Sequence, residues 1–382
     1  MKILFYLAGF ALFYAMIGYP LTLLILDKLI KRENKQDYSI KPSVSVIISA
    51  YNEEDVIEKK LENIIQTDYP DYEVIIANDS STDRTVEICE EFIRNNPDYD
   101  IRINTVKNHL GKTNAQNEAV EVAKGEIIVF SDANSMFKSN AISELVSYFV
   151  DDDIEYVCGS LIYHEDDEIS SVVAENTYWN FELKMRKIES NIKTITNGNG
   201  AIYAVRKEDY RHIDLVNSHD YELPLYAALN HKRALYNPKA VAFEKAGQTT
   251  ADEFKRKVRM QRRILTNIFT NLKRLNIFEY GWFSFFTFNH KTLRYLQAFF
   301  HIVLLVTNFF LLGEGVFYGS FFLMQIGFYA LAIIGQLSGA KSKIFYFPRY
   351  YCAMMLAQII GAYRELRGYS KPTWEKAETT RK

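Results

Sequence analysis

The chain has 382 residues, which at about 150 residues per domain is too long for one small domain. Lys and Arg number 45 against 47 Asp and Glu, and this near-neutral balance argues against a nucleic-acid-binding protein or a disordered acidic chain. Three cysteines, Cys89, Cys158 and Cys352, lie far apart without CxxC spacing, which favours reduced structural thiols over a disulfide framework or a zinc site.

The first element is an apolar segment without charged side chains, from Ile3 to Leu26. A bilayer needs about 20 apolar residues for a helical crossing, so we expect a transmembrane helix within residues 1–27. A cleaved signal peptide is the alternative, but its apolar part would be only about 7–15 residues long. Cations are more frequent after the segment than before it, where only Lys2 stands. The positive-inside rule therefore predicts that the following domain is cytosolic.

The polar middle of the chain alternates between strand and helix patterns. Residues 44–50, 73–77 and 126–131 are short β-branched apolar runs, typical of strands buried on both faces of a parallel sheet. Residues 53–66 and 83–94 repeat apolar side chains at helical spacing. This order predicts a βαβ nucleotide-binding layout, in which ligands lie beyond the carboxyl ends of the strands.

Polar residues follow each predicted strand. They are Tyr51-Asn52-Glu53-Glu54, Asn78-Asp79-Ser80-Ser81 and Asp132-Ala133-Asn134-Ser135. One such group alone is an ordinary turn and helix cap, but three at strand ends favour a ligand site. The chain contains neither GxGxxG nor GxxxxGK[ST], which excludes the usual dinucleotide and P-loop phosphate cradles.

A second apolar block follows the polar middle. Tyr295–Gly313 and Gly315–Ala340 lack Asp, Glu, Lys and Arg, and we expect two crossings joined by a tight outer turn. For residues 344–363 we favour an interfacial or re-entrant helix over a third crossing, because that crossing would place the cations that follow outside the cell. We assign residues 276–363 to interfacial and transmembrane helices and residues 364–382 to a cytosolic basic tail.

Seven segments in this order resemble the family 2 glycosyltransferases, membrane enzymes that include the synthases of cellulose, hyaluronan and poly-N-acetylglucosamine. The segments are SVIISAYNEE, VIIANDSSTD, HLGKTNAQNEA, SDANS, NGNGAIYAVRK, HDYELPL and KRKVRM. The resemblance implies an α/β fold, with a cytosolic GT-A, Rossmann-like nucleotide-sugar domain at residues 42–275 and flanking transmembrane helices.

The resemblance also assigns the donor-binding residues. The loop after the first strand and the acid after the second hold the nucleoside in that family, which implies this role for Tyr51, Asn52, Glu53 and Asp79. Lys112 would bring a cation to the diphosphate. Its alternative is a solvated lysine at a helix start, because a lone lysine is usually exposed.

Asp132 and Asn134 match the acidic metal motif of the family, which implies Mg²⁺ or Mn²⁺ as the cofactor. Hard divalent cations prefer oxygen ligands, and Mg²⁺ commonly binds one or two carboxylates plus phosphates. The second acidic position is an asparagine here, whose amide oxygen can coordinate a cation but carries no charge. We therefore expect metal dependence and leave the choice of metal open.

Inversion at the sugar requires a base, and the family uses the Asp that ends a Thr-Glu-Asp-like motif. Asp220 fills this position, His219 stands where an acid is usual, and Glu222 is the reserve candidate. A helix N-cap is the alternative role for Asp220. A general base must first lie within hydrogen-bond reach of the acceptor hydroxyl, and only then does its pKa matter.

Two further segments concern the acceptor. Gly198-Asn199-Gly200 resembles a loop that lets the acceptor sugar approach the backbone, with a simple turn as the alternative. In processive synthases a Gln-x-x-Arg-Trp motif caps the site. Here Arg259 matches its Arg, but Arg256 and Met260 replace its Gln and Trp, and Gln261-Arg262-Arg263 is a poorer, shifted match. Trp179 and Trp374 are the candidates to replace the missing aromatic residue.

The resemblance implies an inverting, metal-dependent glycosyltransferase of the cell membrane, a multi-pass protein whose catalytic domain is cytosolic. It would use a nucleotide sugar, with UDP-sugar as the expected donor, to build a cell-surface polysaccharide or glycolipid on a saccharide or lipid-linked acceptor, in contact with membrane lipid and without nucleic acid. The alternatives are a single transfer to a polyprenyl phosphate and a non-catalytic accessory subunit. A pure transporter has little support, because the apolar segments contain no chain of ionisable residues.

Overall fold

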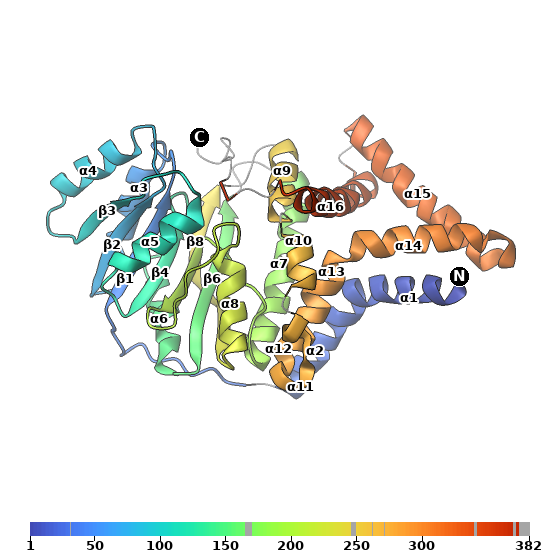
Figure 1. Cartoon of the computed structure of the whole chain (residues 1–382), viewed down its shortest axis with the longest axis horizontal. Coiled ribbons are helices and arrows are strands. Elements are labelled where there is room, and N and C mark those ends of the chain that lie inside the picture. The colour runs from blue at the N-terminus through green and yellow to red at the C-terminus, as the bar shows by residue number, and fades with distance from the viewer. Residues whose placement is uncertain are drawn as a thin grey trace. The chain divides into compact units, whose positions relative to one another are not determined.

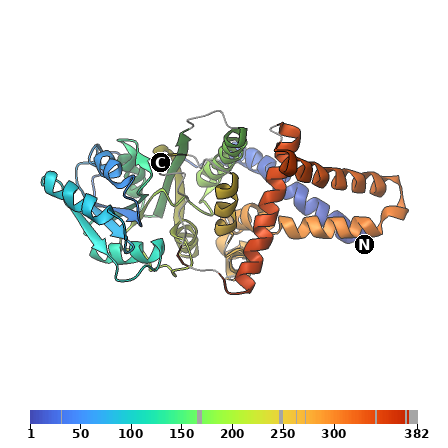
Figure 2. The same ribbon diagram turned by 90° about the horizontal axis from the view of Figure 1, so that it is seen from above.

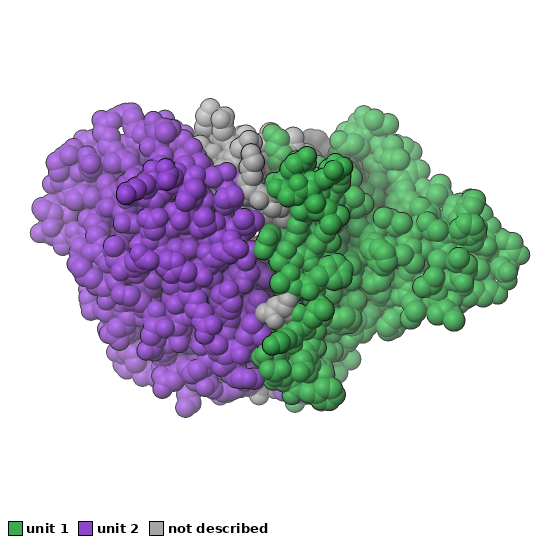
Figure 3. Space-filling view, in the orientation of Figure 1, with its two compact units in different colours: residues 1–29, 167–182, 249–370 green, residues 30–166, 183–248, 371–382 purple. Residues whose placement is uncertain are grey.

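The computed structural model describes residues 1–30, 32–164, 170–245, 250–261, 263–270, 272–339, 342–369 and 372–373. The chain divides into two compact units, coloured in Figure 3. Unit 1 comprises Met1–Leu29, Asp167–Glu182 and Thr249–Ser370, and unit 2 comprises Ile30–Asp166, Leu183–Gln248 and Lys371–Lys382.

Unit 2 is built on an eight-stranded mixed sheet with the strand order β3-β2-β1-β4-β7-β6-β8-β5. Strands β3, β2, β1 and β4 are parallel, whereas β7 is antiparallel to both β4 and β6. The strands are β1 (Val44–Ala50), β2 (Tyr72–Asn78), β3 (Ile101–Thr105), β4 (Ile127–Asp132), β5 (Met136–Phe137), β6 (Ile154–His164), β7 (Ile202–Arg206) and β8 (Arg233–Lys245).

Helices cover both faces of this sheet, because its central strands are apolar on both sides. Every residue of β1 is buried. The side chains of α3, α4 and α6 pack on one face, and those of α5 and α8 pack on the other. The helices of unit 2 are α3 (Ile57–Ile64), α4 (Thr85–Asn95), α5 (Lys112–Val122), α6 (Ala141–Val146), η2 (Ser147–Val150) and α8 (His219–Leu229), together with the end of α7 (Ser170–Ile192).

The predicted strands at 44–50, 73–77 and 126–131 are confirmed to within one residue at each end. The strand order reverses between β1 and β4, so the connections after these two strands lead away in opposite directions. In doubly wound sheets this reversal opens a crevice beyond the carboxyl ends of the strands, where ligands bind. The polar segments after β1, β2 and β4 lie at this edge.

Unit 1 is helical. In it α1 and α14 lie side by side, with an apolar cluster that includes Phe5, Leu12 and Leu304 between them (Figure 1, Figure 2). Its elements are α1 (Lys2–Phe13), η1 (Tyr14–Gly18), α2 (Tyr19–Leu29), α9 (Thr250–Met260), α10 (Ile264–Phe269), η3 (Leu272–Leu275), α11 (Ile277–Tyr280), α12 (Trp282–Phe286), η4 (Thr287–Thr292), α13 (Leu293–Tyr295), α14 (Gln297–Phe310), η5 (Leu312–Glu314), α15 (Val316–Ser338), α16 (Lys343–Leu366) and the start of α7.

Among the described residues, two helices are long and apolar enough to cross a membrane, Lys2–Leu29 and Val316–Ser338. A third candidate is the pair Trp282–Tyr295 and Gln297–Phe310, which bends by 59° at its break and is either a broken span or a re-entrant loop. The bend lies at the start of the crossing predicted over Tyr295–Gly313. The predicted interfacial segment 344–363 lies within α16, which continues through Pro348.

Candidate active site

The three polar segments after β1, β2 and β4 meet because the strands that carry them are neighbours in register. Ala50 at the end of β1 pairs with Asn78 on one side, and Ser49 pairs with Asp132 on the other. The side chains that follow therefore extend from one edge of the sheet. This edge is the reversal point of the strand order, and we take it as the candidate active site.

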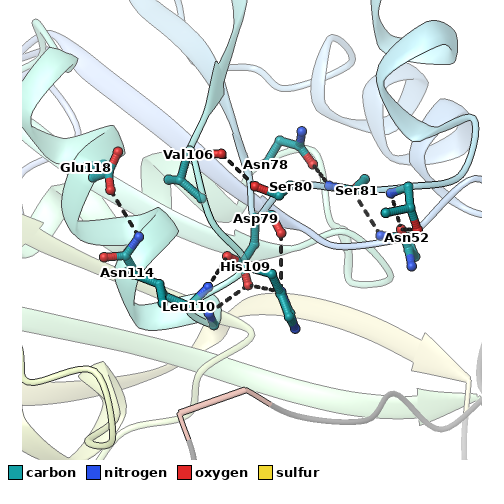
Figure 4. Close-up of polar contacts among 12 residues, drawn as sticks. Asn52, Asn78, Asp79, Ser80, Ser81, Val106, His109, Leu110, Asn114 and Glu118 are labelled. Carbon is teal, nitrogen blue, oxygen red and sulfur yellow. Dashed lines mark hydrogen bonds and ion pairs between the residues drawn. The ribbon is translucent and has the colours of Figure 1, made fainter.

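The loop after β1 is fixed by hydrogen bonds to the loop after β2 (Figure 4). The Oδ1 of Asn52 accepts from the backbone N of Thr82 at 2.7 Å, and the backbone N of Asn52 donates to the Oγ of Ser81 at 3.0 Å. Asn52 adopts a φ of 54°, in the left-handed region that asparagine tolerates better than most residues. Glu53 is buried, and its backbone N donates to the Oγ1 of Thr85 at 2.8 Å.

Asp79, directly after β2, is a buried carboxylate with three donors around it (Figure 4). The backbone N of Leu110 donates to its Oδ1 at 3.1 Å, and that of Gly111 to its Oδ2 at 2.8 Å. The Nδ1 of His109 lies 2.8 Å from the same Oδ2. Burial raises the pKa of Asp79, although the charge of His109 and the two amides act in the opposite direction. The carboxylate thereby connects β2 to the start of α5.

Lys112 is the first residue of α5 and points at the acidic turn after β4. Its Nζ forms an ion pair with the Oδ1 of Asp132 and donates to the carbonyl of Gly200 at 3.0 Å. Only 20% of its side chain is exposed, so the alternative of a solvated lysine at a helix start is wrong. Gly111 before it adopts a φ of 101°, and a Cβ there would lie 2.6 Å from the carbonyl oxygen of Pro372. Both observations explain the glycine at this position.

Asp132 and Asn134 present oxygen atoms in this turn. Within the described residues, the Asp132 carboxylate contacts only Lys112, and the Asn134 amide forms no hydrogen bond. No group of three His, Cys, Asp or Glu side chains gathers there or elsewhere in the described part of the chain. One carboxylate and one amide oxygen fit a hard divalent cation whose remaining ligands are phosphates and waters.

Side chains of α3 fix the acidic turn, residues 132–135, and the strand that follows it through hydrogen bonds. The Nζ of Lys60, which is fully buried, donates to the carbonyl of Ser135 and lies 3.9 Å from the centre of the Phe137 ring. The amide of Asn63 bonds both the backbone N and the carbonyl of Phe137, at 2.7 and 2.8 Å. Burial lowers the pKa of Lys60 to about 7, and the charges of Asp132 and Glu244 oppose this shift.

Asp220 lies in the first turn of α8. Ser218 is the N-cap residue of this helix, so the alternative that Asp220 is the cap is wrong. The carbonyl of Asp220 accepts from the backbone N of Gly198 at 2.7 Å. Within the described part of the chain the Asp220 carboxylate has no hydrogen-bond partner. Glu222 is already engaged, because it bonds the hydroxyl of Tyr226, whose pKa is raised by burial and by the charge of Glu222.

The Gly198-Asn199-Gly200 loop connects Asp220 to Lys112. A Cβ on Gly198 would lie 1.9 Å from the hydroxyl oxygen of Tyr156, so the aromatic ring demands glycine there. The Oδ1 of Asn199 accepts from the backbone N of Ala201 at 2.9 Å, and its Nδ2 donates to the carbonyl of Gly159 at 2.6 Å. These contacts give the loop a fixed conformation.

A comparison with protein families shows which family the residues of this site resemble. The family model described as glycosyl transferase family 2 matches residues 45–213, which carry β1 to β4 and every polar segment described above except α8. Residues 45–213 therefore carry a family 2 glycosyltransferase domain.

Two curated relatives are similar to this chain over part of their length. The poly-beta-1,6-N-acetyl-D-glucosamine synthase of Staphylococcus epidermidis is 31% identical over 121 residues, which are 32% of this chain and 28% of that protein. The UDP-Glc:alpha-D-GlcNAc-diphosphoundecaprenol beta-1,3-glucosyltransferase WfaP of Escherichia coli is 29% identical over 145 residues, 37% of this chain and 55% of that protein. The chain therefore matches less than two thirds of the length of either relative.

A solved structure resembles the chain over nearly its whole length. The mannosyltransferase PcManGT from Pyrobaculum calidifontis, in complex with GDP-Man and Mn²⁺, aligns with a TM-score of 0.74 and 20% identity, covering 96% of this chain and 98% of that chain. At this identity the likeness concerns the fold, and the predicted GT-A, Rossmann-like α/β class is confirmed.

The structure brings most of the predicted site residues together in unit 2. These are Tyr51, Asn52, Glu53, Asp79, Lys112, Asp132, Asn134 and Asp220. Arg259 lies exposed on α9 of unit 1, so its predicted role at the donor stays a prediction. Arg262, Trp374 and the side chain of Trp179 lie outside the described residues.

Sequence reasoning missed one residue of this site, His109. Its ring stacks on Tyr51 and its Nδ1 faces Asp79. The sequence feature that could have indicated His109 is its position two residues before Gly111, in the segment that also contains Lys112. A histidine there carries no pattern of its own, because the stacking depends on how the first two loops fold against each other.

Proposed function

We propose that this chain transfers a sugar from a nucleoside-diphosphate sugar to an acceptor hydroxyl with inversion at the anomeric carbon. The donor first to be tested is a UDP-sugar, because WfaP is named for one. The acceptor is a saccharide or a lipid-linked sugar, and the product is a cell-surface polysaccharide or glycolipid. The names of the two curated relatives support this class of product.

The observation that carries the proposal is a continuous set of contacts between the proposed donor and acceptor groups. Asp132 pairs with Lys112, Lys112 donates to the carbonyl of Gly200, and two residues earlier Gly198 donates to the carbonyl of Asp220. A donor-side cation and a free carboxylate are therefore held within one short loop of each other. Transfer requires this proximity of leaving group and base.

In the proposed reaction Asp220 accepts the proton of the acceptor hydroxyl as its oxygen forms a bond to the anomeric carbon. The bond from that carbon to the diphosphate oxygen breaks, and its electron pair leaves with the nucleoside diphosphate. Lys112 stabilises the charge that develops on the diphosphate, because an ammonium in a partly dry site acts more strongly than in water. Asp79 and Tyr51 hold the nucleoside part.

A divalent cation is proposed as the cofactor, held by Asp132 and Asn134. When bound it supplies Lewis-acid stabilisation of the leaving diphosphate. The Mn²⁺ in the PcManGT complex supports this assignment. Within the described residues the Asn134 amide forms no hydrogen bond, and the Asp132 carboxylate contacts only Lys112. Mg²⁺ and Mn²⁺ both suit these ligands.

The protein is proposed to act at the cell membrane, with unit 1 embedded and the catalytic domain cytosolic. The two long apolar helices and the bent third candidate support membrane association. A single transfer to a polyprenyl phosphate is the second candidate function, and the lipid diphosphate acceptor in the name of WfaP favours keeping it.

The test is product formation by membranes that carry the full chain, supplied with labelled nucleotide sugars and sized by gel filtration. We expect labelled product that is lost with a chelator, in Asp132→Asn and in Asp220→Asn. Glu222→Gln tests the reserve base, and Asp98→Asn, an exposed acid remote in sequence from the motifs, is the matched control. A long polymer indicates a processive synthase, and a small lipid-extractable product indicates single transfer. Turnover that persists in Asp220→Asn would exclude this base.

A further inference from the structure

His219, next to the proposed base, is a buried histidine whose two ring nitrogens both face tyrosine hydroxyls. Only 3% of its surface is exposed. Its Nδ1 lies 2.9 Å from the hydroxyl of Tyr203, and its Nε2 lies 3.3 Å from the hydroxyl of Tyr210. Tyr203 belongs to β7, and Tyr210 lies in the connection between β7 and α8.

The hydrogen bonds around these tyrosines decide the protonation of the ring. Asn117 is fixed in orientation, because its Nδ2 donates to the carbonyl of Ile213 at 2.8 Å and its Oδ1 accepts from the backbone N of that residue at 3.2 Å. Tyr210 donates to this same Oδ1 at 2.6 Å, so its oxygen is left to accept from the Nε2–H of His219. The Nδ1 is then the acceptor for Tyr203, whose oxygen accepts from the Nε2 of Gln116 at 3.3 Å.

One neutral tautomer of His219 satisfies every group in this network. Burial lowers the pKa of His219 to about 3, and the charges of Lys112 and His212 act in the same direction. Asp220 is the titratable residue adjacent in sequence, and the two tyrosines are the groups in direct contact. The imidazole thus serves as a fixed donor and acceptor and not as a proton carrier.

The network joins three parts of the site. Gln116 and Asn117 lie on α5, the helix that begins with Lys112. Tyr203 stacks on Phe130, with ring centroids 4.7 Å apart, and Phe130 precedes Asp132 by two residues on β4. His219 packs edge-on against the same Phe130 ring at 5.2 Å.

We propose that His219 is a positioning residue that fixes Asp220 relative to the donor-binding start of α5. His219 and Asp220 are consecutive in the first turn of α8. The hydrogen bonds of the His219 side chain and the hydrogen bond from the backbone N of Gly198 to the Asp220 carbonyl therefore both restrain the backbone that carries the base. An acid at position 219 could not replace the imidazole, because a carboxylate only accepts and the proton of Tyr210 is committed to Asn117.

This role rests on the proposed function, and the experiment separates the two. The variants are His219→Ala, which removes both bonds, His219→Asn, whose side-chain oxygen can stand at the place of Nδ1, and Tyr203→Phe, which keeps the ring stack without its hydroxyl. His231→Asn is the matched control, since His231 is exposed in the turn after α8 and asparagine tolerates its φ of 60°. Measurements are kcat and donor KM of the full chain in membranes, binding of the nucleoside diphosphate, and thermal unfolding.

We expect His219→Ala to lower kcat roughly 10- to 100-fold with donor KM and nucleoside diphosphate affinity unchanged, as for a misplaced reacting group. His219→Asn should recover most of the loss. Tyr203→Phe should lower kcat without changing donor KM. In the double variant with His219→Ala, the fall in kcat should be smaller than the product of the two single effects, because both substitutions remove the same hydrogen bond.

The role of His219 alone would be overturned by an unchanged kcat in His219→Ala or by equal losses in the Ala and Asn variants. A fall in nucleotide binding that parallels the fall in kcat would also overturn it, since that pattern indicates general loss of structure. A wild-type chain without transferase activity, or full activity in Asp220→Asn, would instead refute the proposed function and this role with it.

Discussion

The rings of Tyr51 and His109 stack with their centroids 3.8 Å apart and their planes 15° from parallel. Tyr51 follows β1, whereas His109 precedes α5 and contacts the Asp79 carboxylate after β2. The pair thus joins an aromatic surface to a buried acid at one strand edge. A nucleobase needs both, a flat face to stack on and a polar group for its edge.

The first prediction concerns this pair. Tyr51→Ala should weaken binding of the nucleoside diphosphate roughly 5- to 100-fold, because stacking of a base on an aromatic side chain contributes about 1–3 kcal/mol. His109→Ala should weaken it as well, since it removes the stacking partner and a donor to Asp79. Isothermal titration with the purified chain measures both. Unchanged affinity in both variants would place the nucleobase elsewhere.

The second prediction concerns Lys112. Lys112→Met removes the ammonium while keeping the length of the side chain, and donor KM should rise roughly 10- to 100-fold, since hydrogen bonds to charged groups contribute about 1.5–3 kcal/mol. Affinity for the nucleoside without phosphates should stay the same. Lys59→Met is the control, because Lys59 is exposed on α3. Equal loss of affinity for nucleoside and nucleoside diphosphate would argue against a phosphate contact.

A third prediction uses the uncharged second position of the acidic turn. Asn134→Asp adds a carboxylate beside Asp132, so the affinity for Mn²⁺ in the presence of nucleoside diphosphate should increase. Asp132→Asn should abolish it. Electron paramagnetic resonance of free Mn²⁺ measures binding without relying on turnover. Mn²⁺ affinity that is the same in all three proteins would refute this metal site.

Lys60 leads to a prediction about pH and stability. The pKa of Lys60 is about 7 in the folded chain, against 10.5 without burial. Below pH 7 the side chain is therefore charged in the folded and the unfolded chain, and the free-energy cost of burying the ammonium is fully present. Between about pH 7 and pH 10.5 the unfolded chain binds the extra proton, and stability rises with pH. The melting temperature of Lys60→Met, relative to that of the unsubstituted chain, should therefore be higher at pH 6 than at pH 9. Thermal unfolding in detergent at both pH values tests this, and a difference that does not depend on pH would contradict it.

Gly198 and Gly200 allow a matched comparison within one loop. Gly198→Ala forces a methyl group against the Tyr156 ring and should cost about 1–3 kcal/mol of stability, as overpacking of a dense core does. In Gly200→Ala the nearest atom to the new Cβ is the Nζ of Lys112 at 3.5 Å, an ordinary contact, so stability should be retained. Thermal unfolding of the two variants distinguishes them, and equal melting temperatures would refute the argument.

The parallel half of the sheet could be predicted from sequence because its strands are continuous apolar runs. Residues 44–50 coincide with β1 for this reason. The predicted helix from residue 53 starts only at Ile57, because the backbone of Asn52 and Glu53 is bonded to the loop after β2. Such long-range bonds leave no periodic signal. The antiparallel strands were not predicted, and β5 is only two residues long.

The candidate site divides in the same way. Asp79 and Asp132 follow apolar runs, and Asp220 stands in a motif that resembles one of the family. Their positions in the chain could therefore be predicted from the sequence, whereas their roles stay predictions. The ion pair of Lys112 with Asp132 and the tyrosine contacts of His219 arise only when α5, β7 and α8 pack on one face of the sheet. Contacts of this kind depend on the tertiary arrangement, which a single sequence does not encode in local patterns.

The ion pair between Lys112 and Asp132 gives the carboxylate proposed to bind the metal an internal counter-ion. In the proposed site a lone divalent cation that approaches Asp132 would meet an ammonium of like charge, whereas a diphosphate would offer that ammonium a replacement anion and release the carboxylate. Under the proposed function, donor and cation would therefore favour each other's binding, and the lysine would make metal binding conditional on the substrate.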